Sequence, residues 1–303
     1  MKKILLLAFV VAAAFVVAPA APAADPPTVP FPSAQSGAVF VAAQTVTADG
    51  AMSNYFAPGT TVVFRAYAVD GKTRKVVTKK LAKYFYVKIP NQPNLKFKYT
   101  PKKNGASGRY AWTARWNVPA SYPAGIVAFK VVVQTKSKHL GSFVQVPVAT
   151  SQLTISTTPQ TPFGGGPGAT AAPSGTKVNV ALYVDSVNGT RPSGAAPRPI
   201  GCTQTNVYKR GEQVVIRAWG FELATGAVLS TDNVSEAHFS VPGMSNVLLN
   251  WGSHGATGNK VWFWTNAFIL PASYPLGDSI ITVSFTTVSG KTATFPYQIT
   301  VIP

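Results

Sequence analysis

A short peptide string repeats in this chain at a fixed spacing. Pro-Ala-Ser-Tyr-Pro occupies Pro119–Pro123 and again Pro271–Pro275, a spacing of 152 residues (271 − 119). The same spacing aligns the segment 59–67 (GTTVVFRAY) with the segment 211–219 (GEQVVIRAW). Because two separate matches at one spacing rarely arise by chance, we interpret the chain as a tandem duplication of one module.

Each repeat has the pattern of an all-β domain. Short runs rich in Val, Ile, Phe, Tyr, Trp and Thr alternate with Gly and Pro, and charged residues make up only 12% of the chain. In the segment 95–100, a period of two predicts that Leu95, Phe97 and Tyr99 face inward while Lys96 and Lys98 face solvent. We therefore predict two tandem antiparallel β-sandwiches.

The repeated string predicts a corner between two sheets. Pro119 and Pro123 lack an amide hydrogen and cannot continue a central ladder, while Gly125 would permit a tight return. We expect Tyr122 to pack across this bend. An apolar strand, such a corner and a final hairpin together resemble bacterial immunoglobulin-like and fibronectin-type-III-like modules. The resemblance implies a sandwich fold but no particular function.

The N-terminus has the features of a bacterial secretory signal. Lys2 and Lys3 precede the apolar run Ile4–Ala18, which is too short to span a bilayer, and Ala-x-Ala cleavage sites follow. We expect an extracytoplasmic protein, in the periplasm or at the cell surface. The predicted divisions are a signal peptide (1–24), a disordered leader (25–35), a basic sandwich (36–156), a Gly/Pro-rich linker (157–176) and a second sandwich (177–303).

Charge is distributed unevenly between the two repeats. Residues 26–158 carry 17 Lys and Arg against 2 acids, a net of +15, whereas residues 174–303 carry 8 against 6, a net of +2. Eleven cations of the first repeat form one run without an acid: Lys72, Arg74, Lys75, Lys79, Lys80, Lys83, Lys88, Lys96, Lys98, Lys102 and Lys103. Because like charges on one surface repel, this run predicts a polyanion-binding surface.

Several anionic partners fit such a surface. The candidates are a cell-wall polyanion, an acidic polysaccharide, acidic lipid head groups and extracellular nucleic acid. Tyr84 and Tyr86 lie among the cations and are candidates for stacking on sugars or bases. Only alternate residues of a strand can face outward, so we expect one or two of Tyr84, Phe85 and Tyr86 in the core.

Cys202 is the only cysteine of the chain, which excludes an internal disulfide. Its thiol has three open interpretations: an inert half-buried group, an intermolecular disulfide, or a reactive or metal-bound group. His238, Met244 and His254 lie in the same repeat and raise the question of a copper site. Blue-copper proteins place Cys, His and Met close together near the C-terminus, unlike this order, so we predict no metal site.

No catalytic motif is evident. The chain has no Gly-x-Ser-x-Gly elbow or glycine-rich phosphate loop, and its nine acids give little support for a glycosidase pair. We expect a non-enzymatic protein without a cofactor, which attaches to an anionic surface through its first domain. The second domain, with Trp219, Trp251, Trp262 and Trp264, is expected to contact a protein or carbohydrate or to self-associate. The alternatives are an accessory or structural subunit of an extracytoplasmic enzyme complex and, with less support, a hydrolase with an unrecognised site.

Overall fold

A computed structural model describes residues 39–100, 112–145, 149–158, 178–190, 201–254 and 261–303. The expected signal peptide (1–24), the expected leader (25–35) and most of the expected linker lie outside the described residues, as do Lys102 and Lys103. The described part is an all-β structure of packed sheets, with one 3₁₀ turn at Ala149–Ser151. None of its helical segments is long and apolar enough to cross a membrane.

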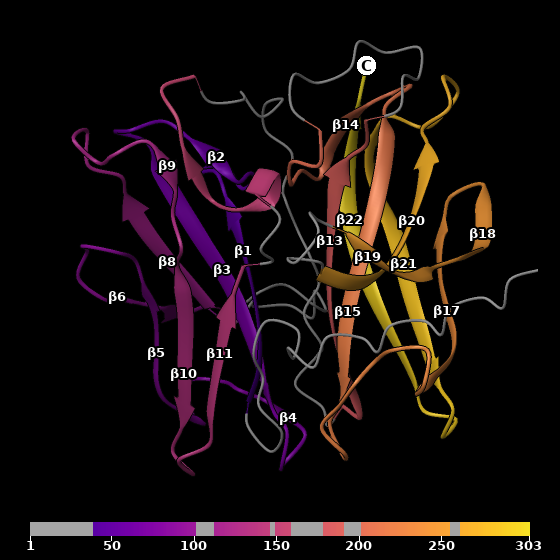
Figure 1. The fold of residues 1–303 in the computed structure, drawn as a ribbon, viewed down its shortest axis with the longest axis horizontal. Helices are drawn as coiled ribbons and strands as arrows, with labels where there is room; N and C mark the ends of the chain where they lie inside the picture. Colours follow the sequence, from indigo (N-terminus) through magenta and orange to yellow (C-terminus); the bar gives the residue numbers. More distant parts are fainter. Residues whose placement is uncertain (1–38, 101–111, 146–148, 159–177, 191–200, 255–260) are drawn as a thin grey trace, which may run out of the picture.

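The first half of the chain forms three sheets (Figure 1). The first sheet has, in spatial order, β1 (Val39–Val46), β3 (Thr61–Asp70), β8 (Trp112–Asn117) and β7 (Lys98–Tyr99), with β4 (Lys75–Val76) paired to β3. The second has β11 (Leu140–Val144), β10 (Lys130–Thr135), β5 (Ala82–Lys88) and β6 (Leu95–Lys96). The third, smaller sheet has β2 (Tyr55–Phe56), β12 (Thr154–Ile155) and β9 (Gly125–Ile126).

The second half forms two larger sheets (Figure 1). One has β13 (Val180–Asn188), β15 (Gln213–Glu222), β20 (Val261–Ile269) and β19 (Asn250–His254), with β16 (Ala227–Val228) paired to β15. The other has β14 (Val207–Lys209), β22 (Thr292–Ile302), β21 (Gly277–Thr287), β17 (Val234–Val241) and β18 (Met244–Leu248). Strand pairing is antiparallel throughout the described part except for β12 with β2 and β14 with β22.

The spacing of 152 residues relates hydrogen bonds of the two halves. The indole of Trp112 donates to the Val77 carbonyl over 2.8 Å, and the indole of Trp264 donates to the Leu229 carbonyl over 2.6 Å. The corner shows the same relation, because the amides of Tyr122 and Tyr274 each donate, over 2.9 Å, to the carbonyl of the proline three residues earlier. Residues 152 positions apart in the two halves therefore form the same two hydrogen bonds, one from a tryptophan indole and one at the corner.

The two halves pack closely against each other through aromatic side chains. The ring of Phe40 in β1 lies 5.9 Å from that of Phe221 in β15, and Tyr67 in β3 donates a hydrogen bond to the Leu182 carbonyl in β13. Every residue of β1 and of β13 is buried. One cluster of buried apolar side chains consequently extends through both halves, a contact that the sequence analysis did not predict.

Candidate functional site

Exposed lysines gather at one end of the first half. The β3–β4 turn, β4, the loop after it and the start of β5 carry Lys72, Lys75, Lys79, Lys80 and Lys83, all exposed. The β10–β11 turn brings Lys136 and Lys138 to the same end, because the Lys136 amide donates to the Leu81 carbonyl over 2.8 Å. We call these seven lysines the basic end. Lys136 and Lys138 are distant in sequence from the predicted run, and only strand pairing brings them to it.

The nearest acid to these lysines is already engaged. Asp70 is only 3% exposed, and one of its carboxylate oxygens accepts amide hydrogens from Lys72 (3.0 Å) and Thr73 (3.3 Å). The other oxygen lies 2.8 Å from Nδ1 of His139. Asp70 therefore satisfies backbone and imidazole groups rather than a lysine of the basic end.

The other acid of the first half lies far from the basic end. Asp49 follows the last residue of β1, Val46, whereas Asp70 pairs with the first residue of that strand. Within the residues that the structure describes, none of the seven lysines forms an ion pair. The basic end is thus a concentration of positive charge in which no lysine is ion-paired within the described residues.

Two of the predicted aromatic contacts lie on an outer sheet face. In β5, Phe85 and Val87 are buried, whereas Tyr84 and Tyr86 are half-buried on the opposite face and Lys88 is exposed. The rings of Tyr84 and Tyr86 lie 5.4 Å apart at an angle of 35°, and Lys88 Nζ lies 5.9 Å from the centre of the Tyr86 ring. This agrees with the expectation that one residue of the aromatic triplet belongs to the core.

Neighbouring strands add two lysines to this face. Lys96 in β6 is the register partner of Tyr86, and Lys130 in β10 is the register partner of Lys88. We call the set of Tyr84, Tyr86, Lys88, Lys96 and Lys130 the tyrosine–lysine face. Lys130 was absent from the predicted surface, because the pairing of β10 with β5 joins segments that are distant in sequence.

Two predicted cations lie elsewhere. The segment 95–99 crosses between sheets, since β6 pairs with β5 while β7 pairs with β8, so Lys98 projects from a different sheet than Lys96. The two lysines are exposed as predicted but do not share one strand face. Arg74 reaches the second half, where its Nη1 donates to Oδ1 of Asn179 over 2.8 Å.

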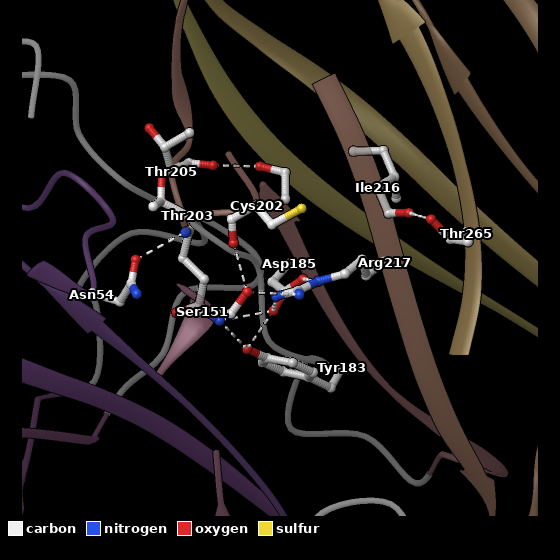
Figure 2. Close-up of polar contacts among 12 residues, drawn as sticks. Asn54, Ser151, Tyr183, Asp185, Cys202, Thr203, Thr205, Ile216, Arg217 and Thr265 are labelled. Atoms are coloured by element: carbon white, nitrogen blue, oxygen red, sulfur yellow. Dashed lines mark hydrogen bonds and ion pairs between the residues drawn. The ribbon is translucent and has the colours of Figure 1, made fainter. Parts of the chain in front are cut away.

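A buried polar network fills the junction between the halves (Figure 2). Arg217 forms two hydrogen bonds of 2.7 Å with Asp185, and their side chains are 3% and 0% exposed. The third guanidinium nitrogen donates over 2.9 Å to Ser151, a residue of the first half. Burial alone would lower the pKa of Arg217, but the Asp185 carboxylate outweighs it and the net shift is upward. Both charges of this pair have a partner, and the hydrogen bond to Ser151 links the network to the first half.

Cys202 lies beside this network and takes part in it through its backbone. Its amide donates to the Asn188 carbonyl over 2.8 Å, and its carbonyl accepts a hydrogen bond of 2.6 Å from Ser151 (Figure 2). The residue is half-buried with a free thiol and a φ of 60°. An intermolecular disulfide through Cys202 stays a prediction.

The described residues offer no metal-binding group of three or more His, Cys, Asp or Glu side chains. His238 faces Glu236 at 3.4 Å, an arrangement of two side chains at a strand surface. Of the tryptophans expected to make contacts in the second half, Trp219 (2% exposed) and Trp264 (6%) belong to the core. Trp251 and Trp262 are half-buried and stack on each other, with ring centres 5.9 Å apart.

Comparisons with known proteins identify a fold-level likeness only. No family model matches the chain, and no curated protein matches it. Among solved structures, the fibronectin(III)-like modules of Clostridium thermocellum CbhA are 11% identical with a TM-score of 0.22, covering 86% of this chain and 93% of that one. The Bacteroides ovatus glucan-utilisation protein SGBP-B, in complex with a mixed-linkage heptasaccharide, is 10% identical with a TM-score of 0.18, covering 82% and 43%. Domains 4–9 of the surface layer protein SbsC are 13% identical with a TM-score of 0.21, covering 89% and 31%. Scores this low carry no inference about function.

Proposed function

We propose that this chain is an extracytoplasmic, non-enzymatic binding protein that attaches to an anionic polymer through its first half. The observation that carries the proposal is the basic end, a set of seven exposed lysines, none of which forms an ion pair within the described residues. Concentrated like charge destabilises a folded surface and attracts polyanions, whose binding releases condensed counterions. A polymer with many negative charges would both relieve the repulsion among the lysines and bind with release of counterions.

Solubility alone is a weaker explanation for this charge. A soluble surface needs net charge but not its concentration at one end. Both halves hold an equivalent pair, Asp70 with His139 and Glu222 with Lys291. The halves differ in the lysines around that pair, because the positions that correspond to Lys72, Lys136 and Lys138 are Ala224, Val288 and Gly290.

Salt-dependent binding of inorganic polyphosphate by the full mature chain tests the proposal. The double variant Lys136→Gln/Lys138→Gln removes two charges from the basic end. Lys98→Gln/Arg115→Gln removes two charges from β7 and β8, outside the basic end, and serves as the matched control, since both residues are exposed. We expect the first pair to lower the slope of log affinity against log salt by about 0.7–0.9 for each lost contact, and the control pair to leave it unchanged.

Two results would reject this proposal. The first is an affinity for polyphosphate that does not change between about 50 and 200 mM salt. The second is an equal loss in both double variants, which would mean that net charge rather than the basic end determines binding. Without polymer binding, the accessory-subunit hypothesis becomes the stronger one.

A further inference from the structure

The tyrosine–lysine face contains an unfavourable pairing of like charges. Lys88 and Lys130 are direct cross-strand partners in the β5–β10 pair, and both are exposed. Like charges directly opposite each other on a sheet destabilise it. Lys96 projects from the adjacent strand, opposite Tyr86, and places a third ammonium group on the same face. Within the described residues, none of these three lysines forms an ion pair, so an external anion would relieve the repulsion.

The rest of this face suits a sugar ring better than a bare anion. The neighbouring rings of Tyr84 and Tyr86 offer an amphipathic surface, since each presents an apolar body and a polar hydroxyl. Gln134 is the register partner of Tyr84 and supplies both an amide donor and a carbonyl acceptor beside it. On the edge strand, Leu140 and Val144 are 50% and 39% exposed. Aromatic, amide and ammonium groups thus lie side by side on one sheet.

We propose that the tyrosine–lysine face binds an acidic polysaccharide. Sugar rings would lie against Tyr84 and Tyr86, and carboxylates carried by those sugars would contact Lys88, Lys96 and Lys130. The inference rests on the proposed function and names the chemical class of the polymer.

A single-stranded nucleic acid fits this face less well. Proteins that bind such strands combine base stacking with cations that track the phosphate backbone along the stacked bases. On this face the cations lie together at the Lys88 end, and the register neighbours of Tyr84, Gln134 and then Leu140, are neutral. The lysines of the basic end beyond Tyr84 lie at the alternate position of β5 (Lys83) or in the β10–β11 turn (Lys136) rather than beside the stacked rings.

The test compares three polymers on the full mature chain: polygalacturonate, inorganic polyphosphate and oligothymidylate. Tyr84→Leu/Tyr86→Leu keeps apolar packing but removes the aromatic faces. We expect this variant to weaken polygalacturonate binding at least about tenfold, or about 1.4 kcal/mol, and to leave polyphosphate binding within about twofold. Lys88→Gln/Lys130→Gln should also weaken polygalacturonate binding, more than the control pair Lys98→Gln/Arg115→Gln does.

The outcomes separate this inference from the proposed function. Binding of polyphosphate without binding of polygalacturonate, or an equal effect of the tyrosine variant on both, overturns the inference alone. Tyrosine-dependent binding of oligothymidylate that is tighter than that of polygalacturonate assigns the face to nucleic acid and overturns it too. Failure to bind any of the three polymers overturns both proposals.

A second measurement is independent of how the tyrosine variant folds. Lys130→Gln removes one member of the like-charge pair and should raise the melting temperature of the polymer-free protein at low salt. An unchanged or lower melting temperature would show that the pair is not repulsive and would remove the reason for an anion there.

Discussion

Removing the guanidinium of Arg217 should be among the most damaging single changes at the junction. Arg217→Met leaves the Asp185 carboxylate, whose side chain is 0% exposed, with hydrogen bonds from Tyr183 (3.1 Å) and Gln204 (2.8 Å) but no counter-charge. Breaking a buried pair from one side costs about 3–5 kcal/mol. It also removes the hydrogen bond to Ser151, which links the two halves. Since whole domains unfold with only about 5–15 kcal/mol, the variant should lose a large fraction of its stability.

Urea unfolding followed by tryptophan fluorescence measures this loss. The double variant Arg217→Met/Asp185→Leu removes both charges and should recover most of it, because no unpaired charge then stays buried.

Arg65 provides the matched control for this experiment. It corresponds to Arg217 at the spacing of 152 residues, but it is half-buried, and its Nη1 donates to the Gly50 carbonyl over 3.5 Å. Arg65→Met should cost clearly less than Arg217→Met, because a partly exposed charge and its partners are screened by water. The reasoning is refuted if Arg217→Met costs less than about 1 kcal/mol, or if Arg65→Met costs as much as Arg217→Met.

Two further predictions concern tyrosines. Tyr274 at the second corner is 4% exposed and its hydroxyl lies 2.7 Å from Ser279 Oγ, whereas Tyr122 at the first corner is half-buried. Tyr274→Ala should therefore lower the free energy of unfolding in urea by about 3–5 kcal/mol, and Tyr122→Ala should lower it clearly less. Equal losses in the two variants would contradict this prediction. Burial raises the pKa of Tyr297 well above 10.0, and nearby Tyr208 adds to the shift. The stability from keeping Tyr297 neutral is therefore fully present below pH 10, and it is lost as the pH rises further, because the unfolded chain then releases a proton that the folded chain keeps. Tyr297→Phe should flatten the fall of melting temperature above about pH 10, and identical alkaline profiles for this variant and the unchanged protein would count against this account.

Local alternation in the sequence predicted the strand faces well. The period of two in 95–99 gave the exposed lysines and the buried Phe97, and the sandwich class follows from many such short segments. It could not show that β6 and β7 belong to different sheets, or that Lys130, Lys136 and Lys138 join the earlier run. The sheet assignment of β6 and β7 depends on their pairing with β5 and β8. The position of Lys130, Lys136 and Lys138 depends on the pairing of β10 with β5, which joins residues far apart in the chain.

The junction escaped sequence analysis for a different reason. An outward-facing Phe40 or Tyr67 has the same local pattern whether water or a second sheet covers it. One signal was present, because Val39–Ala43 is apolar without alternation, which is typical of a strand that is covered on both faces. Arg217 and Asp185, charged residues within apolar strands, were a second signal of a buried pair.

The packing of β1 and β3 against β13 and β15 places corresponding strands of the two halves on opposite sides of one contact. Two separate copies of one chain would meet through such strands under a symmetry constraint. In a true homodimer every substitution appears twice, so a lysine added to one subunit is added to its twin as well. Covalent continuity removes that constraint. Residues 26–158 can carry a net charge of +15 while residues 174–303 stay at +2. The two halves of one molecule can therefore differ in charge, which two identical subunits could not do.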